Sequence, residues 1–160
     1  MKQKLLRLLI VMTISITALF ALGMTAFADE AGDFTITATN GGVLTTDDYT
    51  YENNVLTIKS NTPVTISGTT TADSIIIKEN IDANITLNGV NIDVSATGEL
   101  NTGNVDASIS GTPAFKIADD STGDVTIILA DGSENVLKSG VKCAGLQKNG
   151  EYTADLGMLT

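Results

Sequence analysis

Short stretches in which every second residue is apolar recur after residue 28, and they constrain the fold more than any other feature of the chain. Examples are VTI at 64–66, ITL at 85–87 and VTIIL at 125–129. Gly, Asn, Asp and Thr separate the stretches at intervals of roughly ten residues, which is typical of strands joined by turns. Threonine, which suits strands and disfavours helices, supplies 20 of the 132 residues that follow residue 28. The pattern predicts an all-β fold.

Two of these blocks, 74–92 and 114–137, resemble each other at an offset of 40 residues. The equivalent pairs are Ile77 and Ile117, Ile85 and Val125, and Leu87 and Ile127. A third copy begins at 144–150 (AGLQKNG) and resumes at Met158. Degenerate repeats with polar corners are typical of a β-solenoid, because every coil places apolar residues inward and turns outward. The segment 95–112, rich in Gly, Asn, Ser and Thr, is predicted to be a loop insertion in one coil.

A β-sandwich is the competing all-β fold, and it predicts a hairpin at Asp131-Gly132. A two-residue hairpin at this position would place apolar residues opposite charged ones at two of three positions on the main apolar face. Its three pairs would be Leu129 with Glu134, Ile127 with Val136, and Val125 with Lys138. A half-buried sheet disfavours such pairs. We therefore predict a six-residue corner at 130–135, although a hairpin with a longer loop stays open.

Residues 1–28 have the features of a secretory signal peptide. A basic beginning (Lys2, Lys4, Arg7) precedes an apolar stretch and the small-residue site Ala26-Phe27-Ala28. Removing them leaves six Lys, no Arg and 19 acidic residues, so the formal charge of residues 29–160 is 6 − 19 = −13. We expect a secreted protein that does not bind nucleic acid or insert into membranes once the signal is removed. Cys143, the only cysteine, has no intrachain disulfide partner.

Three segments resemble the secreted carbohydrate-binding β-helix proteins of clostridial and related Gram-positive bacteria. They are 84–95 (NITLNGVNIDVS), 115–140 and 144–150. The resemblance implies a right-handed parallel β-helix with the shape of a pectate lyase but without catalysis. It also implies binding of an acidic, pectin-like polysaccharide with calcium ions held by surface carboxylates.

The last residues depart from that family, because the chain stops at Met158-Leu159-Thr160 where a strand is predicted to start. We therefore predict a short β-helix domain at 29–160 that is incomplete at its C-terminal end. An open end of this kind leaves unpaired backbone groups, and it predicts coil-to-coil association there.

Candidate metal ligands lie at the predicted corners. They are Asp119, Asp120, Asp124 and Asp131. Stacked corners can surround one calcium ion with carboxylate oxygens. The alternative is that Asp occupies corners because it tolerates turn geometry and caps local N–H groups.

Candidate sugar-binding residues are Tyr49, Tyr51 and Asn135. The two tyrosines share one face of a strand and can form a stacking platform, or they can cover a sheet edge. The chain has no His, and residues 29–160 have no Arg, so nothing marks a catalytic centre and we expect a protein that is not an enzyme. Two other hypotheses stay open: a structural solenoid segment of a surface adhesin, and a fragment of a polysaccharide lyase.

Overall fold

Two mixed β-sheets make up the regular structure of the computed structural model, which describes residues 28–119 and 121–148. The first sheet contains β1 (Asp29–Ala31), β2 (Phe34–Ala38), β5 (Val64–Thr70), β7 (Ala83–Asp93), β9 (Val125–Leu129) and β10 (Val136–Lys138). The second contains β3 (Tyr49–Glu52), β4 (Val55–Ile58), β6 (Ser74–Ile77), β8 (Phe115–Ile117) and β11 (Leu146–Lys148). The described residues include one 3-10 helix, η1 (Val105–Ala107), and no α-helix. The prediction of an all-β fold is confirmed.

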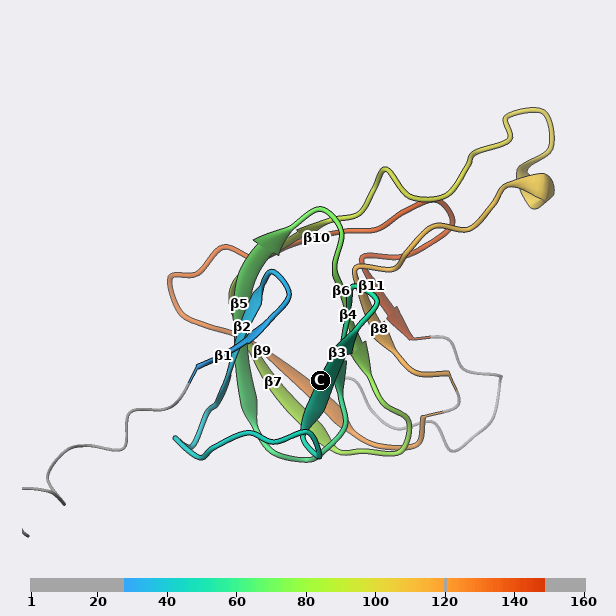
Figure 1. Ribbon diagram of the computed structural model, residues 1–160. Helices are drawn as coiled ribbons and strands as arrows, with labels where there is room; N and C mark the ends of the chain where they lie inside the picture. The colour runs from blue at the N-terminus through green and yellow to red at the C-terminus, as the bar shows by residue number, and fades with distance from the viewer. Residues whose placement is uncertain (1–27, 120, 149–160) are drawn as a thin grey trace, which may run out of the picture.

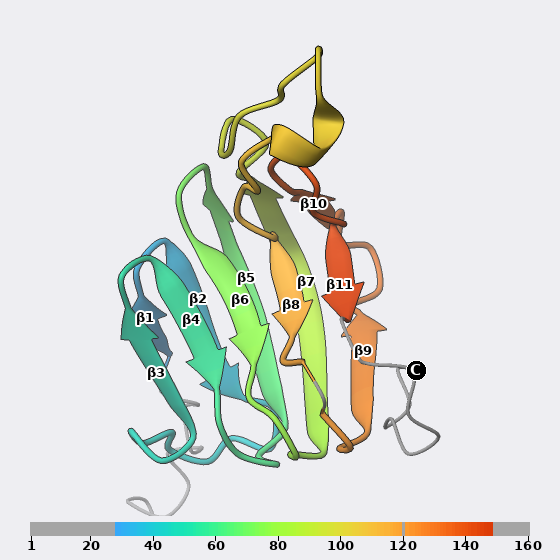
Figure 2. The same cartoon turned by 90° about the vertical axis from the view of Figure 1, so that its right-hand side faces the viewer.

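From β4 to β9, consecutive strands alternate between the two sheets. Each strand from β6 to β9 pairs in parallel with the strand two places earlier in the chain. Figure 2 shows the result, with β4, β6, β8 and β11 side by side in front of the other sheet. This order brings residues about one sequence repeat apart into direct contact.

The core lies between the sheets and consists of apolar rows that run across the strands. In one row Ile58 pairs with Ile77 and Ile77 with Ile117, and all three are at most 1% exposed. Opposite sides of each strand alternate, so the intervening threonines face solvent and the isoleucines face the other sheet. The period-two pattern of the sequence is thus the inward-facing pattern of the strands.

Parallel pairing does not extend to the N-terminal strands. The pairs β1–β2, β2–β5 and β3–β4 are antiparallel. The sequence analysis predicted a parallel arrangement and missed these pairs. The turns between β1 and β2 and between β3 and β4 are tight, and Gly32, Asn53 and Asn54 adopt positive φ angles there. Gly and Asn tolerate that conformation, which allows the chain to reverse within two residues.

The predicted repeat is correct in the second sheet and two residues out in the first. Ile77 pairs with Ile117, an offset of 40, as the sequence predicted. Ile85 pairs with Ile127 and not with Val125, an offset of 42. The cause is the longer turn between β8 and β9, which has seven residues where the turn between β6 and β7 has five. A shift of two keeps the same side chains facing the core.

The strands on either side of Asp131-Gly132 do not pair with each other. Both β9 and β10 pair in parallel with β7, so the prediction that there is no two-residue hairpin is confirmed. The predicted corner at 130–135 is the segment between them, but it does not lead to another face as predicted. Both strands lie on the same edge of β7, because β7 is long enough to accommodate them one after the other.

The segment 95–112 projects beyond the ends of the strands, as Figure 2 shows. It contains η1 and a backbone bridge between Glu99 and Ile109. Thr97 anchors its base, where the hydroxyl accepts a hydrogen bond from the backbone N–H of Thr112 at 2.8 Å.

Candidate functional site

The predicted calcium ligands do not gather in one place. Asp119 is exposed and forms an ion pair with Lys116 (3.0 Å) in the turn after β8. Asp124 ends that turn, and its backbone N–H donates to Oδ1 of Asp82 at 3.0 Å. Asp131 is exposed beyond the other end of β9, which is five residues long, so about 15 Å of strand separates it from the turn. The fourth candidate, Asp120, lies outside the described residues.

No group of three or more Asp, Glu, Cys or His side chains that could hold a metal ion occurs within residues 28–119 and 121–148. Calcium binding therefore stays a prediction of the sequence. The local alternative explains what is seen of Asp82, because a carboxylate that accepts a backbone N–H from the adjacent coil stabilises a turn without any metal.

Asn135 is committed to the sheet and does not face outward as predicted. Its Oδ1 accepts a hydrogen bond from the backbone N–H of Val90 at 2.8 Å, and its Nδ2 donates to Oγ of Ser133 at 2.8 Å. The register of β7 against β5 shifts just before Val90, next to Gly89, which has a φ of 77°. Asn135 thus satisfies a buried N–H that the bulge in β7 leaves without a strand partner.

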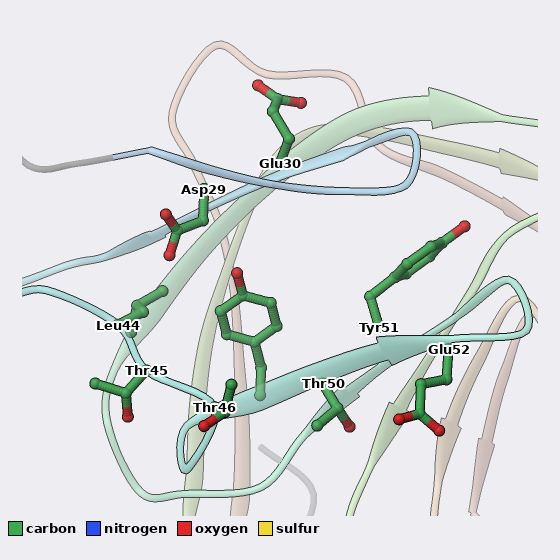
Figure 3. Close-up of a pocket in the computed structure, with 9 residues that line it drawn as sticks. Asp29, Glu30, Leu44, Thr45, Thr46, Thr50, Tyr51 and Glu52 are labelled. Atoms are coloured by element: carbon green, nitrogen blue, oxygen red, sulfur yellow. The ribbon is translucent and has the colours of Figure 1, made fainter.

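Tyr49 and Tyr51 line a hollow of about 580 Å³ where the first strands of the two sheets approach each other. β1, β3 and the loop before β3 form its walls (Figure 3). The nine lining residues are Asp29, Glu30, Leu44, Thr45, Thr46, Tyr49, Thr50, Tyr51 and Glu52. Its volume lies within the range of about 300–1,000 Å³ that is typical of small-ligand sites.

The carboxylates of the hollow differ in their orientation. In Figure 3, Asp29 points into the space between β1 and β3, whereas Glu30 and Glu52 point outward on the two sides of its mouth. Alternation along β1 explains the difference, because Asp29 shares the inward face with the buried Ala31 and Glu30 does not. The mouth is therefore acidic on both sides, and the interior holds an aromatic wall and one carboxylate.

A buried carboxylate fixes the position of Tyr51. Asp73, which is 3% exposed, accepts the Tyr51 hydroxyl on Oδ1 at 3.0 Å and the backbone N–H of Asp33 on Oδ2 at 2.9 Å. One side chain thus ties the β1–β2 turn to β3, across the two sheets. Gly32 has to be glycine here, since an added Cβ would lie 2.3 Å from the Tyr51 ring.

Both tyrosines of the hollow are half-buried and pack against the core cluster. Burial raises the pKa of Tyr49, and the carboxylate of Asp29, which accepts a hydrogen bond from its hydroxyl, raises it further. Burial likewise raises the pKa of Tyr51, followed by the effect of Asp73. The two phenols are therefore neutral at physiological pH, and their rings supply apolar surface and hydrogen-bonding hydroxyls.

Asp48 holds the loop that forms one side of the hollow. Its Oδ1 accepts hydrogen bonds from the hydroxyls of Ser60 (2.8 Å) and Thr62 (2.7 Å). Its Oδ2 accepts the backbone N–H of Thr45 at 2.9 Å and the Thr45 hydroxyl at 3.0 Å. These bonds, the one from Thr62 foremost, lower the pKa of Asp48 to about 2. The wall that includes Thr45 and Thr46 is therefore fixed before any ligand binds.

The sequence analysis identified the two tyrosines but missed Asp29, Glu30, Glu52 and the supporting Asp73. Glu52 follows Tyr51 directly and could have been included from the acidic segment around the tyrosines. Asp29 and Asp73 lie 20 or more residues away from the tyrosines in sequence, and no local pattern marks them. The structure does not describe residues 1–27, where the predicted signal peptide lies.

No protein-family model, curated protein or solved structure matches the chain. Within the part of the chain that the structure describes, no helix is long and apolar enough to span a membrane.

Proposed function

We propose that residues 29–160 are a secreted, non-catalytic carbohydrate-binding domain built as a right-handed parallel β-helix. The alternation of strands between two sheets, with each new strand paired in parallel to the one two places earlier, supports the solenoid architecture. The signal-like segment at 1–28 supports secretion.

The hollow beside Tyr49 and Tyr51 is the observation on which the binding function rests. Sugar rings have apolar faces that pack on aromatic side chains, and their hydroxyls need hydrogen-bond partners at the edges. The hollow offers two tyrosine rings together with the side chains of Asp29, Thr45 and Thr46. Asp73 and Asp48 hold its walls from behind, so little ordering is required when a ligand binds.

A blocking substitution tests this function. Thr46→Trp places a large side chain at the hollow, and Thr102→Trp makes the same change at an exposed position on the projecting segment. We expect affinity electrophoresis and calorimetry to show that the native chain and Thr102→Trp bind at least one polysaccharide, and that Thr46→Trp loses that binding. Equal binding by both variants would move the site elsewhere, and no retention on neutral, acidic or amino polysaccharides would refute the function.

Calcium belongs to this proposal as a bridge to acidic sugars. Residues 29–160 have a formal charge of −13, so a pectin-like polyanion is repelled unless cations lie between the two. We expect any binding of polygalacturonate to require calcium and to disappear with a chelator. Retention that is unchanged by the chelator would remove calcium from the proposal.

Secretion has its own test. Expressed with its own first 28 residues in a Gram-positive host, the protein should appear in the culture medium with Asp29 as its first residue, as mass spectrometry would show. An intact Met1 on the purified protein would refute the assignment of the signal peptide.

A structural segment of a surface solenoid is the second candidate function. Within the described residues, no strand pairs with the outer sides of β9, β10 or β11. Ile128 and Leu129 on β9 are 44% and 62% exposed. Exposed strand edges of this kind associate with other strands. A concentration-dependent dimer in analytical ultracentrifugation that Leu129→Lys abolishes would favour this function, and a monomer at all concentrations would oppose it.

A further inference from the structure

Charge is the feature of the hollow that selects among carbohydrates. Three of its nine lining residues are carboxylates (Asp29, Glu30 and Glu52) and none is a cation. Asp33 and Asp73 lie directly behind the ring of Tyr51, to which Asp73 is hydrogen-bonded. The nearby basic group is Lys59, and its Nζ is held by the carbonyl oxygen of Thr46 at 2.6 Å. Cleavage after Ala28 adds one α-ammonium at Asp29, which leaves the lining negative by two charges.

The arrangement of these carboxylates fits an extended organic cation better than a metal ion. Among the described residues no three acidic side chains converge closely enough to hold a metal. Glu30 and Glu52 instead point outward on opposite sides of the mouth, as Figure 3 shows, with the aromatic wall between them. A ligand that contacts all three must be several atoms wide, present an apolar face to the tyrosines and place positive charge at its edges.

We propose that the hollow binds carbohydrate with protonated amino groups, of the kind found in a polymer of glucosamine. The inference rests on the proposed carbohydrate-binding function and names the sugar class for the same site. Each glucosamine unit has an apolar ring face to pack on a tyrosine and an ammonium that a carboxylate attracts. The tyrosines contribute cation–π attraction to the same ammonium groups. An acidic sugar meets repulsion from every charged residue that lines the hollow.

The test compares oligosaccharides that differ only in charge. Glucosamine oligomers and their N-acetylated counterparts have the same backbone, and only the first are cationic. Calorimetry on the protein recovered from the medium should show tighter binding of the glucosamine oligomers at low ionic strength. The difference should shrink in high salt, because salt screens charges at a solvent-exposed mouth. Oligogalacturonate without calcium should bind more weakly than either.

Matched variants assign the effect to the hollow. Glu30→Gln and Glu52→Gln each remove one rim carboxylate, and Glu99→Gln removes an exposed carboxylate on the projecting segment. Each rim variant should weaken binding of the glucosamine oligomers by about two- to fivefold, as expected for one exposed charge pair. Neither should change binding of the N-acetylated oligomers, and Glu99→Gln should change neither affinity.

The possible results separate this inference from the function beneath it. N-acetylated or acidic oligomers that bind as tightly as the glucosamine oligomers, or rim variants without effect, would overturn the charge selectivity and leave carbohydrate binding standing. Failure of every oligosaccharide, with or without calcium, would refute the proposed function as well. Binding of oligolysine in place of any sugar would overturn both, because the cation recognised would then belong to a peptide.

Discussion

Replacing Asp48 with Asn tests how the wall of the hollow is held. The carboxylate accepts four hydrogen bonds from three residues: Thr45, Ser60 and Thr62. Asn keeps one acceptor oxygen, which can retain the backbone N–H of Thr45, and its amide can donate to the rotated hydroxyls. What the substitution removes is the negative charge that strengthens these bonds.

The pKa of Asp48 gives the size of the effect. It falls from 3.8 to about 2 in the folded chain. At about 1.4 kcal/mol per pKa unit, that difference corresponds to roughly 2 kcal/mol. The side chain is half-exposed, so solvent screening reduces the expected loss on substitution to about 1 kcal/mol.

The pH dependence follows from the sign of the change. Because folding lowers this pKa, the carboxylate contributes its full stabilisation above the unfolded value of about 4 and loses it as the pH falls towards about 2. Urea unfolding followed by circular dichroism should show that Asp48→Asn is less stable than the native chain at neutral pH. The difference should vanish at the lowest pH at which both remain folded.

Asp47→Asn is the matched control for this experiment. Asp47 is the exposed neighbour, and its charge is lost without loss of the network. We expect its free energy of unfolding to stay within about 0.5 kcal/mol of the native value. A destabilisation by Asp48→Asn that is independent of pH, or an equal effect of Asp47→Asn, would refute the reasoning.

Three further substitutions test other contacts by the same urea assay. Asn135→Ala strands a buried backbone N–H of β7 and should cost about 1–3 kcal/mol, and an unchanged midpoint would show that water replaces the amide. Gly123→Ala places a Cβ 2.1 Å from a backbone oxygen and should cost more than Gly132→Ala, where no atom lies within 4 Å; the reverse order would contradict this packing. Tyr51→Phe leaves the buried Asp73 with one partner fewer and should cost about 1–3 kcal/mol, unless that carboxylate takes up a proton or a water molecule.

The amino-acid sequence determined the all-β class and the inward-facing residues. Period-two alternation is a local property, and any strand pairing that buries one face must use the same isoleucines, valines and leucines. The comparison of Ile77 with Ile117 even gave the correct neighbour, because the second sheet keeps one spacing. Rejection of the two-residue hairpin followed from charge and burial alone.

Only the tertiary structure decided which surfaces meet. The antiparallel β1–β2 and β3–β4 pairs bring Asp29 beside Tyr49, although 20 residues separate them in sequence. The bulge in β7 turned Asn135 from a predicted ligand contact into the partner of a backbone N–H. Register, bulges and turn lengths depend on hydrogen bonds between distant residues, and local patterns do not encode those pairs. The hollow and its charge are products of these long-range pairings.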